Sequence, residues 1–418
     1  MAIEGFQDLD FQEFHEHELP ARLASGNGAQ AALAVKKMGS LAFRIPDGAA
    51  YTYLADGDGI SVLPGEELAD TVIEVDSEIW QGIVHDYESP PGLLYGGRVK
   101  CTKGKAMRLV AWEPGLRAMY TGRPLHDPKN VQLEDRKGSS LDVNQSFTLE
   151  SDLEDMAHFL RGAGYLFVRG VFSHEETARF REEALSLRAE AVKGDKLSWW
   201  GKNAAGEEIL CRVTRAASKP QLATIPSDPR MLKLKDLSDY ELAHRARASA
   251  EEGVSVIYKH PNMTEGLSDI PWHRDCGMGG HSVMCPILIA SVFLTDASPE
   301  TGELKMLPGS WTGTIGYMDP NDPDAPQGAQ FHARPGDVSL HYGDVMHTAP
   351  PPTGVALEQY RISAVTGYSR PEARNHRGGS SYNDVLHGRE DGQVEHLATV
   401  AERQSDDSDG SDRSNRSN

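Results

Sequence analysis

The chain has 418 residues, and its 42 basic and 62 acidic side chains give it a formal net charge of −20. A chain of this length predicts two or three domains. The negative charge argues against nucleic acid or an anionic membrane surface as the main partner, because both would repel it. We interpret the charge as a contribution to solubility.

Four cysteines fit a reduced cytosol better than a disulfide framework, because they show no CxxC spacing. They are Cys101, Cys211, Cys276 and Cys285. No apolar run is long enough to span a bilayer, and the first residues lack the basic and then apolar pattern of a signal peptide. Residues 416–418 are not a peroxisomal address. We therefore expect a cytoplasmic protein without stable membrane insertion.

The two ends of the chain are polar. Residues 1–19 are also acidic, and we predict that they form a flexible arm. Histidine and glutamate alternate at 13–18, a pattern that favours a solvated segment over a metal site. Residues 376–418 become rich in serine, aspartate and arginine, so we predict a largely disordered tail.

Residues 20–125 predict an α+β domain. Apolar residues alternate with polar or small ones from residue 41 to 59, and glycine-containing turns separate the predicted antiparallel strands. A strand at 72–75 leads into a helix at 77–84 that begins with a serine cap. The segment 99–110 predicts a final hairpin around a basic glycine turn.

This layout, with the runs Pro90-Pro91 and 96–99 after the short helix, resembles the sterol carrier protein type 2 domain. The resemblance implies a domain that holds lipids or acyl chains in an apolar tunnel between its sheet and its helices. A packed domain used for dimerisation or substrate presentation is an equally good interpretation. The sequence is therefore compatible with a homo-oligomer but does not predict one.

Residues 126–147 are polar, have weak periodicity and predict a linker. A capping-box signal at 151–154 then opens a helix with an apolar stripe. A strand at 165–168 follows, and Ser173 begins the next helix.

Two later segments allow more than one interpretation. The adjacent Trp199 and Trp200 fit either a substrate mouth or simple packing. Residues 312–334 are rich in glycine, proline and aspartate, which raises the question of calcium binding. Their spacing lacks the glycine and terminal glutamate of an EF-hand loop, so a lid or an insertion loop is favoured.

The candidate metal ligands begin with His273 and Asp275 in the run PWHRD. On an extended strand, residues two apart point to the same face, so this imidazole and this carboxylate would lie side by side. His347 supplies a second imidazole. Two histidines and one carboxylate can hold one face of an octahedral metal and leave three positions open, as in non-haem Fe(II) oxygenases. Because short H-x-D patterns are common, a surface histidine beside a surface aspartate is the alternative.

Three residues near these ligands need separate interpretations. Arg361, on the next predicted strand, suits a bidentate contact with a dicarboxylate co-substrate. His341 fits either a hydrogen bond to a metal ligand or simple packing. Cys276 adjoins Asp275, but we expect it to face away from the metal.

The surroundings of these residues resemble the phytanoyl-CoA hydroxylase family of Fe(II)/2-oxoglutarate dioxygenases over about residues 148–372. The family's motifs wHxD, TxxNGxLxxxPGSH, PGD and FHxGxxxHxxxPN, and its later arginine, have counterparts here in the same order. Trp311 stands where the family often has histidine, and Ala349 where serine or glycine is common. The segment between His347 and Arg361 is slightly long.

The resemblance implies a double-stranded β-helix (jelly-roll, cupin-like) domain with flanking helices at residues 148–375. It implies Fe(II) bound by His273, Asp275 and His347, with 2-oxoglutarate held by Arg361. It also places Lys259 where family members often have a basic residue near the co-substrate. A solvated lysine at a strand end is the alternative for that residue.

The implied reaction uses O2 and 2-oxoglutarate to oxidise a substrate and releases succinate and CO2. Asp275 fills a position that is small in related halogenating enzymes, so hydroxylation is favoured over halogenation, while desaturation and ring chemistry stay open. The sterol-carrier-like domain suggests a small hydrophobic or carrier-linked substrate. The alternative is a non-catalytic lipid-binding or lipid-transfer protein in which a metal-free jelly roll is only a scaffold.

Overall fold

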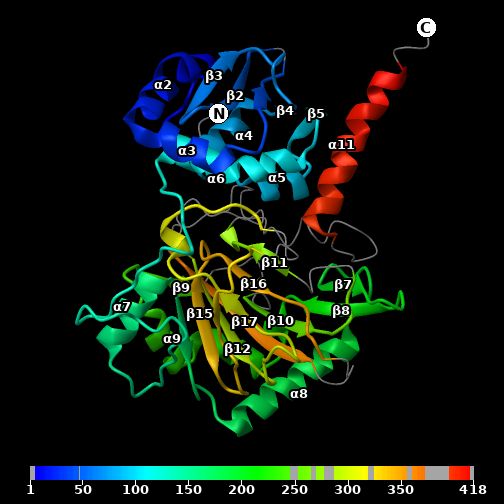
Figure 1. Cartoon of the computed structure of the whole chain (residues 1–418). Helices are drawn as coiled ribbons and strands as arrows, with labels where there is room; N and C mark the ends of the chain where they lie inside the picture. Colours follow the sequence, from blue (N-terminus) through cyan, green and yellow to red (C-terminus); the bar gives the residue numbers. More distant parts are fainter. Residues whose placement is uncertain are drawn as a thin grey trace.

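The computed structural model describes residues 5–46, 48–244, 253–264, 270–276, 287–318, 324–354, 360–371 and 395–414. Cys285 therefore lies outside the described residues, as do Asp319 and Asp322 of the predicted insertion loop. The described residues form an N-terminal α/β unit and a larger β-rich unit, which lie one above the other in Figure 1.

The N-terminal unit begins with a nearly continuous helical segment and then alternates strands with helices. Its elements are α1 (Phe11–Glu13), η1 (Phe14–Glu18), α2 (Leu19–Arg22), η2 (Leu23–Asn27), α3 (Gly28–Val35), β1 (Leu41–Arg44), β2 (Ala50–Asp56), β3 (Gly59–Pro64), β4 (Thr71–Glu74), α4 (Ser77–Val84), α5 (Pro90–Tyr95), β5 (Lys100–Lys103) and α6 (Met107–Thr121).

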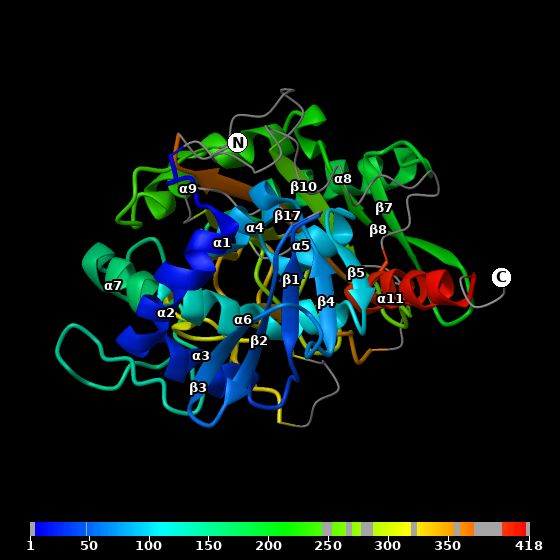
Figure 2. The same cartoon turned by 90° about the horizontal axis from the view of Figure 1, so that it is seen from above.

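These strands form one mixed sheet in the order β3-β2-β1-β4-β5, seen from above in Figure 2. Only β1 and β4 pair in parallel, and the other neighbours are antiparallel. Helices α3, α5 and α6 lie on the side of the sheet that is turned toward the second unit (Figure 1). Large rings of Tyr53, Trp80, Trp112 and Tyr120 fill the core, each at most 2% exposed.

The prediction of a flexible arm at residues 1–19 is wrong for its described part. Phe11 and Phe14 are 7% and 2% exposed, and Leu19 is fully buried in the core of this unit. His15 is also buried and contacts the Phe11 carbonyl and the Tyr53 hydroxyl. Residues at 11, 14 and 15 share one helical face, and burial of that face outweighs the charges on the opposite side.

The predicted hairpin at 99–110 is also wrong after its first strand. Gly104, with φ +78°, closes a turn against Asp70, and α6 begins at Met107. Buried Leu109 and Leu116 lie seven residues apart on α6, which is two helical turns. The apolar pattern of this segment is thus helical, not alternating.

The predicted disordered tail requires a correction as well. Residues Leu397–Ser414 form helix α11, which lies beside α5 and β5 in Figures 1 and 2. Leu397 and Ala401, one helical turn apart, are 5% and 1% exposed in the N-terminal core. The Ser405 hydroxyl accepts a 2.9 Å hydrogen bond from the Ala106 amide. These contacts attach the helix to the N-terminal unit. Residues 376–394 and 415–418 of the tail lie outside the described part.

The second unit contains most of the strands. Its elements are α7 (Leu153–Ala163), β6 (Tyr165–Val168), α8 (His174–Glu190), β7 (Ser198–Lys202), β8 (Glu208–Val213), η3 (Ala216–Ser218), η4 (Leu222–Ser227), α9 (Pro229–Lys235), β9 (Ala243–His244), β10 (Val254–Lys259), β11 (Ile270–His273), β12 (Leu288–Phe293), β13 (Lys305–Met306), η6 (Ser310–Thr312), β14 (Ala329–Gln330), β15 (Val338–Tyr342), β16 (His347–Ala349) and β17 (Arg361–Ser369).

Two antiparallel sheets organise this unit, in agreement with the predicted jelly roll. The larger sheet has the order β6-β15-β12-β17-β10-β8-β7, with β9 beside β17, and the smaller has the order β11-β16-β13-β14. A contact of 3.2 Å between His341 of β15 and Asp275, just after β11, shows that the sheets face each other. The outer face of the large sheet packs against α8, η3 and η4. Among the described residues, no helix has both the length and the apolar character needed to cross a membrane.

Local signals explain how the first helices of this unit start. Ser173 caps α8 as predicted and forms a capping box with Glu176, whereas the N-cap of α7 is Asp152. Gly336 of the predicted PGD turn has φ +93°, and a Cβ there would come within 2.1 Å of the Phe172 carbonyl oxygen. Only glycine fits such a position.

Candidate metal centre

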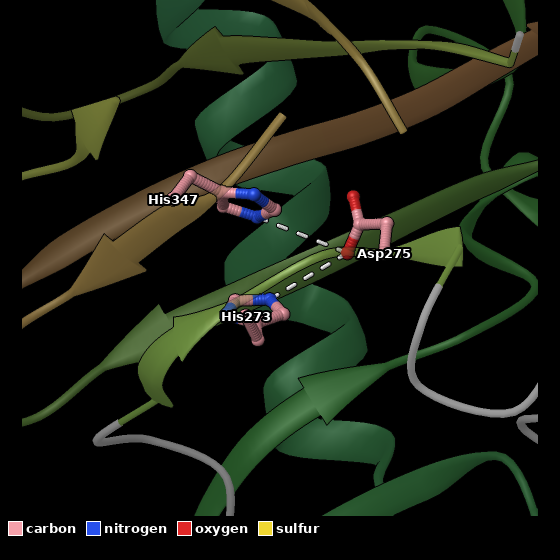
Figure 3. A group of neighbouring side chains, drawn as sticks. All are labelled: His273, Asp275 and His347. Carbon is pink, nitrogen blue, oxygen red and sulfur yellow. Dashed lines mark ion pairs between the residues drawn. The ribbon is translucent and has the colours of Figure 1, made fainter. Parts of the chain in front are cut away.

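Three side chains from two neighbouring strand ends point toward one another in Figure 3. His273 ends β11 and His347 begins β16, and the two residues are direct antiparallel partners. The distances from Asp275 Oδ1 to the Nε2 atoms of His273 and His347 are 3.6 and 3.8 Å. One ligand atom from each residue lies within 4.8 Å of the other two, which is close enough for one metal ion.

The position of Asp275 differs in one respect from the sequence argument. The strand ends at His273, and Asp275 lies in the turn that follows. The turn, not strand alternation, therefore brings the carboxylate toward the two imidazoles.

Backbone contacts fix both imidazoles in the orientation that metal binding requires. Nδ1 of His273 lies 2.9 Å from the Pro271 carbonyl oxygen, and Nδ1 of His347 lies 2.9 Å from the Val345 carbonyl oxygen. A carbonyl can only accept, so each Nδ1 carries the proton. Each Nε2 then presents its lone pair to the centre of the group.

The electrostatics of the group favour the same protonation state. Burial lowers the pKa of His347 well below its usual value, and the nearby His273 and His341 lower it further. Burial would raise the pKa of Asp275, but the neighbouring His347, His273 and His341 hold that pKa well below its usual range. A neutral imidazole beside an ionised carboxylate is the state that binds metal ions.

His341 is a third histidine of this site and comes from the opposite sheet. Its Nε2 lies 3.2 Å from Asp275 Oδ2, while its ring centroid is 4.4 Å from that of His347. The hydrogen-bonding interpretation is therefore favoured over simple packing. A donor on Oδ2 leaves Oδ1 of Asp275 directed at the two ligand imidazoles.

Arg361 is buried at the start of β17 without an acidic partner among the described residues. Its side chain is removed from water, with only 4% of the residue exposed, and burial lowers its pKa to about 10. One terminal nitrogen donates to the Glu303 carbonyl oxygen at 3.0 Å, while the buried Nε has no hydrogen-bond partner within the described part of the chain. A buried guanidinium with a free N–H fits the carboxylate of a dicarboxylate ligand.

Lys259 lies directly opposite Arg361 on β10, so both side chains are on the same face of the large sheet. The residue is 1% exposed, and its Nζ donates to the Ala349 carbonyl oxygen at 2.6 Å. The alternative of a solvated lysine at a strand end is therefore wrong. The contact ties β10 to the strand that carries His347.

Other candidates lie away from the metal ligands. Trp311 donates from Nε1 to the Arg161 carbonyl oxygen at 3.1 Å, and its ring packs on Tyr342 at 4.5 Å. It therefore supports the end of α7. Cys276 is buried beside Gly343 and is not part of the ligand group.

A buried ion network that sequence reasoning missed links this centre to the N-terminal unit. Arg274, between the two ligands of its segment, pairs with Glu113 of α6 and, at 3.1 Å, with Asp344. Asp344 also lies 3.0 Å from Arg117 of α6, which itself pairs with Asp86 at 2.6 Å. Burial alone would lower the pKa of Arg117. The charges of Asp344 and Asp86 more than offset this effect, so the pKa lies well above its usual value. These residues have no local spacing in sequence that could have indicated the network.

Two histidines and one carboxylate between the sheets of a jelly roll, with a buried unpaired arginine on the facing sheet, define the class of non-haem iron, 2-oxoglutarate-dependent oxygenases. Residues 160–354 match the family model described as Phytanoyl-CoA dioxygenase (PhyH). Residues 160–354 thus form a region similar to that family, and the three candidate ligands lie within it. No curated protein matches the chain.

Solved structures with a similar fold cover about half of the chain. EvdMO1 is 21% identical with a TM-score of 0.40, over 52% of this chain and 50% of its own. The chain thus spans half the length of that protein. The non-heme alpha ketoglutarate dependent carbocyclase SnoK from nogalamycin biosynthesis is 23% identical with a TM-score of 0.41, over 56% and 90%. EvdO2 from Micromonospora carbonacea var. aurantiaca, complexed with 2-oxoglutarate, is 18% identical with a TM-score of 0.38, over 54% and 94%.

Proposed function

We propose that the enzyme hydroxylates a small hydrophobic or carrier-linked molecule, with release of succinate and CO2. The observation that supports this best is the convergence of two Nε2 lone pairs and the Asp275 carboxylate on one point. The unpaired guanidinium of Arg361 adds a site for the second substrate of such a reaction.

The roles of the individual residues follow from their contacts. His273, Asp275 and His347 would hold Fe(II), and Arg361 would bind the far carboxylate of 2-oxoglutarate. Lys259 would keep β16 in place and add positive charge beside Arg361. With Fe(II) and 2-oxoglutarate bound, this site would support the oxidative decarboxylation of 2-oxoglutarate by O2.

Asp275 decides between two outcomes of this chemistry. A carboxylate at this position occupies the place that a halide takes in related halogenating enzymes, where the residue is small. His341 holds that carboxylate in place through Oδ2. Hydroxylation is therefore the outcome that we propose.

The N-terminal unit has three antiparallel strands followed by a strand that leads into a short helix, which is the element order behind the predicted resemblance to a sterol carrier domain. However, the rings of Tyr53, Trp80 and Trp112 fill the space between its sheet and helices. An acyl chain would have to displace them. These rings favour a domain that supports or presents the substrate, rather than one that stores a lipid.

The second candidate function is lipid binding or transfer without turnover, with the jelly roll as a scaffold. The feature that supports it is the order of strands and helices in the N-terminal unit, on which the resemblance to a lipid-carrier domain was based. The geometry of the metal centre argues against it, because a scaffold does not require three converging ligand atoms.

The test is an anaerobic titration of the purified protein with Fe(II) and then with 2-oxoglutarate. We expect the weak visible charge-transfer band of the chelate in the wild type and its loss in His273→Ala. Succinate formation that depends on an added substrate would then exclude a pure transfer role. Absence of the band in well-folded wild-type protein would contradict the proposed function.

A further inference from the structure

We propose that Arg212 and Ser255 bind an anionic group of the substrate, a carboxylate, phosphate or sulfate, on the inner face of the large sheet. This assignment rests on the oxygenase function proposed above and names the substrate class of that same site. A guanidinium with free N–H groups binds such oxyanions through two parallel hydrogen bonds.

Strand register places Arg212 on the face of the sheet that is turned toward the metal. Arg212 of β8 is the direct partner of Ile257 of β10, which is the partner of Ser363 of β17. Residues two apart share a face, so Arg212 and Arg361 are on the same side. His341, which contacts Asp275, is on this side as well through β12.

A row of three serines and one valine extends from Arg212 toward the metal ligands across this face. Ser255, Val365, Ser291 and Ser339 are successive partners on β10, β17, β12 and β15. Three strand spacings make the row about 14 Å wide. At its far end, Ser339 is two residues from His341, so a molecule along the row would reach the metal centre.

The inner face stays accessible, whereas the outer face does not. Inner residues at the middle of the sheet are partly exposed, namely Arg212, Ser255, Ile257, Ile289, Val365 and Gly367. Outer residues of the same strands are at most 1% exposed, namely Val254, Val256, Ala290, Val292 and Ala364. A ligand can therefore approach Arg212, Ser255 and Val365 from solvent, whereas Ser291 and Ser339, at the metal end of the row, are buried.

Arg212 is held in place by neutral groups alone within the described part of the chain. Its guanidinium carbon lies 4.8 Å from the centre of the Trp199 ring, and one terminal nitrogen donates to Ser255 Oγ at 3.1 Å. The buried Nε has no hydrogen-bond partner. No carboxylate among the described residues pairs with it, although the protein has a net charge of −20.

A second buried polar atom along the row also has no partner. Ser339 is fully buried, and its Oγ makes no hydrogen bond to any residue that the structure describes. A buried hydroxyl without a partner is unfavourable, and a polar group of the substrate would supply the missing hydrogen bond. The co-substrate site at Arg361 is separate, because Arg212 lies two strand spacings, about 10 Å, from β17.

The test uses anaerobic protein saturated with Fe(II) and 2-oxoglutarate, so that the co-substrate occupies Arg361. Binding of decanoate, inorganic phosphate and decan-1-ol is measured by titration calorimetry. We expect at least one of the two anions to bind about tenfold more tightly than the alcohol. Arg212→Gln should abolish this preference. Arg212→Lys keeps the positive charge but cannot make two parallel hydrogen bonds, so it should retain part of the preference.

The matched control is Arg181→Gln, which removes the same charge from an exposed position on α8 and should leave the preference unchanged. Equal binding of anions and alcohol in the wild type, or an unchanged preference in Arg212→Gln, would overturn the proposal. The chelate band of the wild type is recorded first. Its absence would instead contradict the oxygenase function, so that the two failures are distinguishable.

Discussion

Arg274 lies between the metal-ligand candidates His273 and Asp275 and forms a buried ion pair with Glu113 of the N-terminal unit. Both side chains are less than 10% exposed, at 4% and 7%. The second partner of Arg274, Asp344, is three residues before His347. The N-terminal unit therefore contacts both segments that carry the candidate ligands, and its helix α6 is part of their support.

Replacement of Glu113 by Gln should weaken metal binding. The change leaves the buried guanidinium of Arg274 with Asp344 alone, and loss of one partner in a buried pair costs about 3 kcal/mol. Supporting contacts of this kind change metal affinity about tenfold. In Glu113→Gln, the affinity for Fe(II) and the intensity of the chelate band should both decrease.

The control for this variant is Arg136→Gln, which breaks exposed ion pairs with Asp152 and Asp155. We expect it to leave metal affinity unchanged, because exposed pairs contribute little. If Glu113→Gln lowers only the melting temperature and not the metal affinity, the network joins the two units without positioning the ligands.

Arg361→Ala should weaken the binding of 2-oxoglutarate far more than the binding of iron. Loss of charge-assisted hydrogen bonds to one carboxylate costs about 2 kcal/mol, which corresponds to about a thirtyfold rise in Kd. Titration of the anaerobic Fe(II) protein with 2-oxoglutarate measures this. Arg361→Lys keeps the positive charge but cannot make two parallel hydrogen bonds, so its affinity for 2-oxoglutarate should lie between those of the wild type and the alanine variant. An equal effect on both affinities, or on neither, would place the co-substrate contact elsewhere.

The candidate ligands could be predicted because each lies in a short run with its own signal. PWHRD and the segment around His347 are weak signals when each is taken alone, but their order in the chain, with the motifs between them, agrees with one family. Ser173 and Gly336 were likewise predictable, since a capping box and a glycine turn depend on local geometry.

The features that were missed depend on distant parts of the chain. Glu113 and Arg274 meet only because the two units stack, and nothing in their sequence neighbourhoods indicates it. Arg212 reaches the inner face through the register of three strands, which spacing along the chain does not encode. The segment around Phe14 was misread because its charges mask a narrow apolar stripe.

The stability of the N-terminal unit should depend on pH through His15. Burial lowers the pKa of His15 to about 4 from its ordinary value of 6.5, although its contact with the Phe11 carbonyl opposes the shift. Between these values the unfolded chain binds more protons than the folded chain, so stability rises with pH. As pH falls from 6.5 to 4, about 3 kcal/mol should be lost.

Hydrogen exchange of residues 9–20 in urea, at several pH values, measures this loss. His15→Asn should be less stable at neutral pH, because the histidine contacts are lost, but should show a flatter pH dependence. The same pH dependence in both proteins would mean that another group is responsible.

Helix α11 should contribute directly to the stability of the N-terminal unit. Leu397 is 5% exposed in that core, and removal of a buried leucine side chain costs about 2–5 kcal/mol. Leu397→Ala should therefore lower the midpoint of urea unfolding and expose the helix to proteases. Leu185, which is 43% exposed on α8, provides the matched control, and Leu185→Ala should change stability by less than about 0.5 kcal/mol. An equal loss in both variants would mean that α11 does not stabilise the unit by packing, and that its order has another cause.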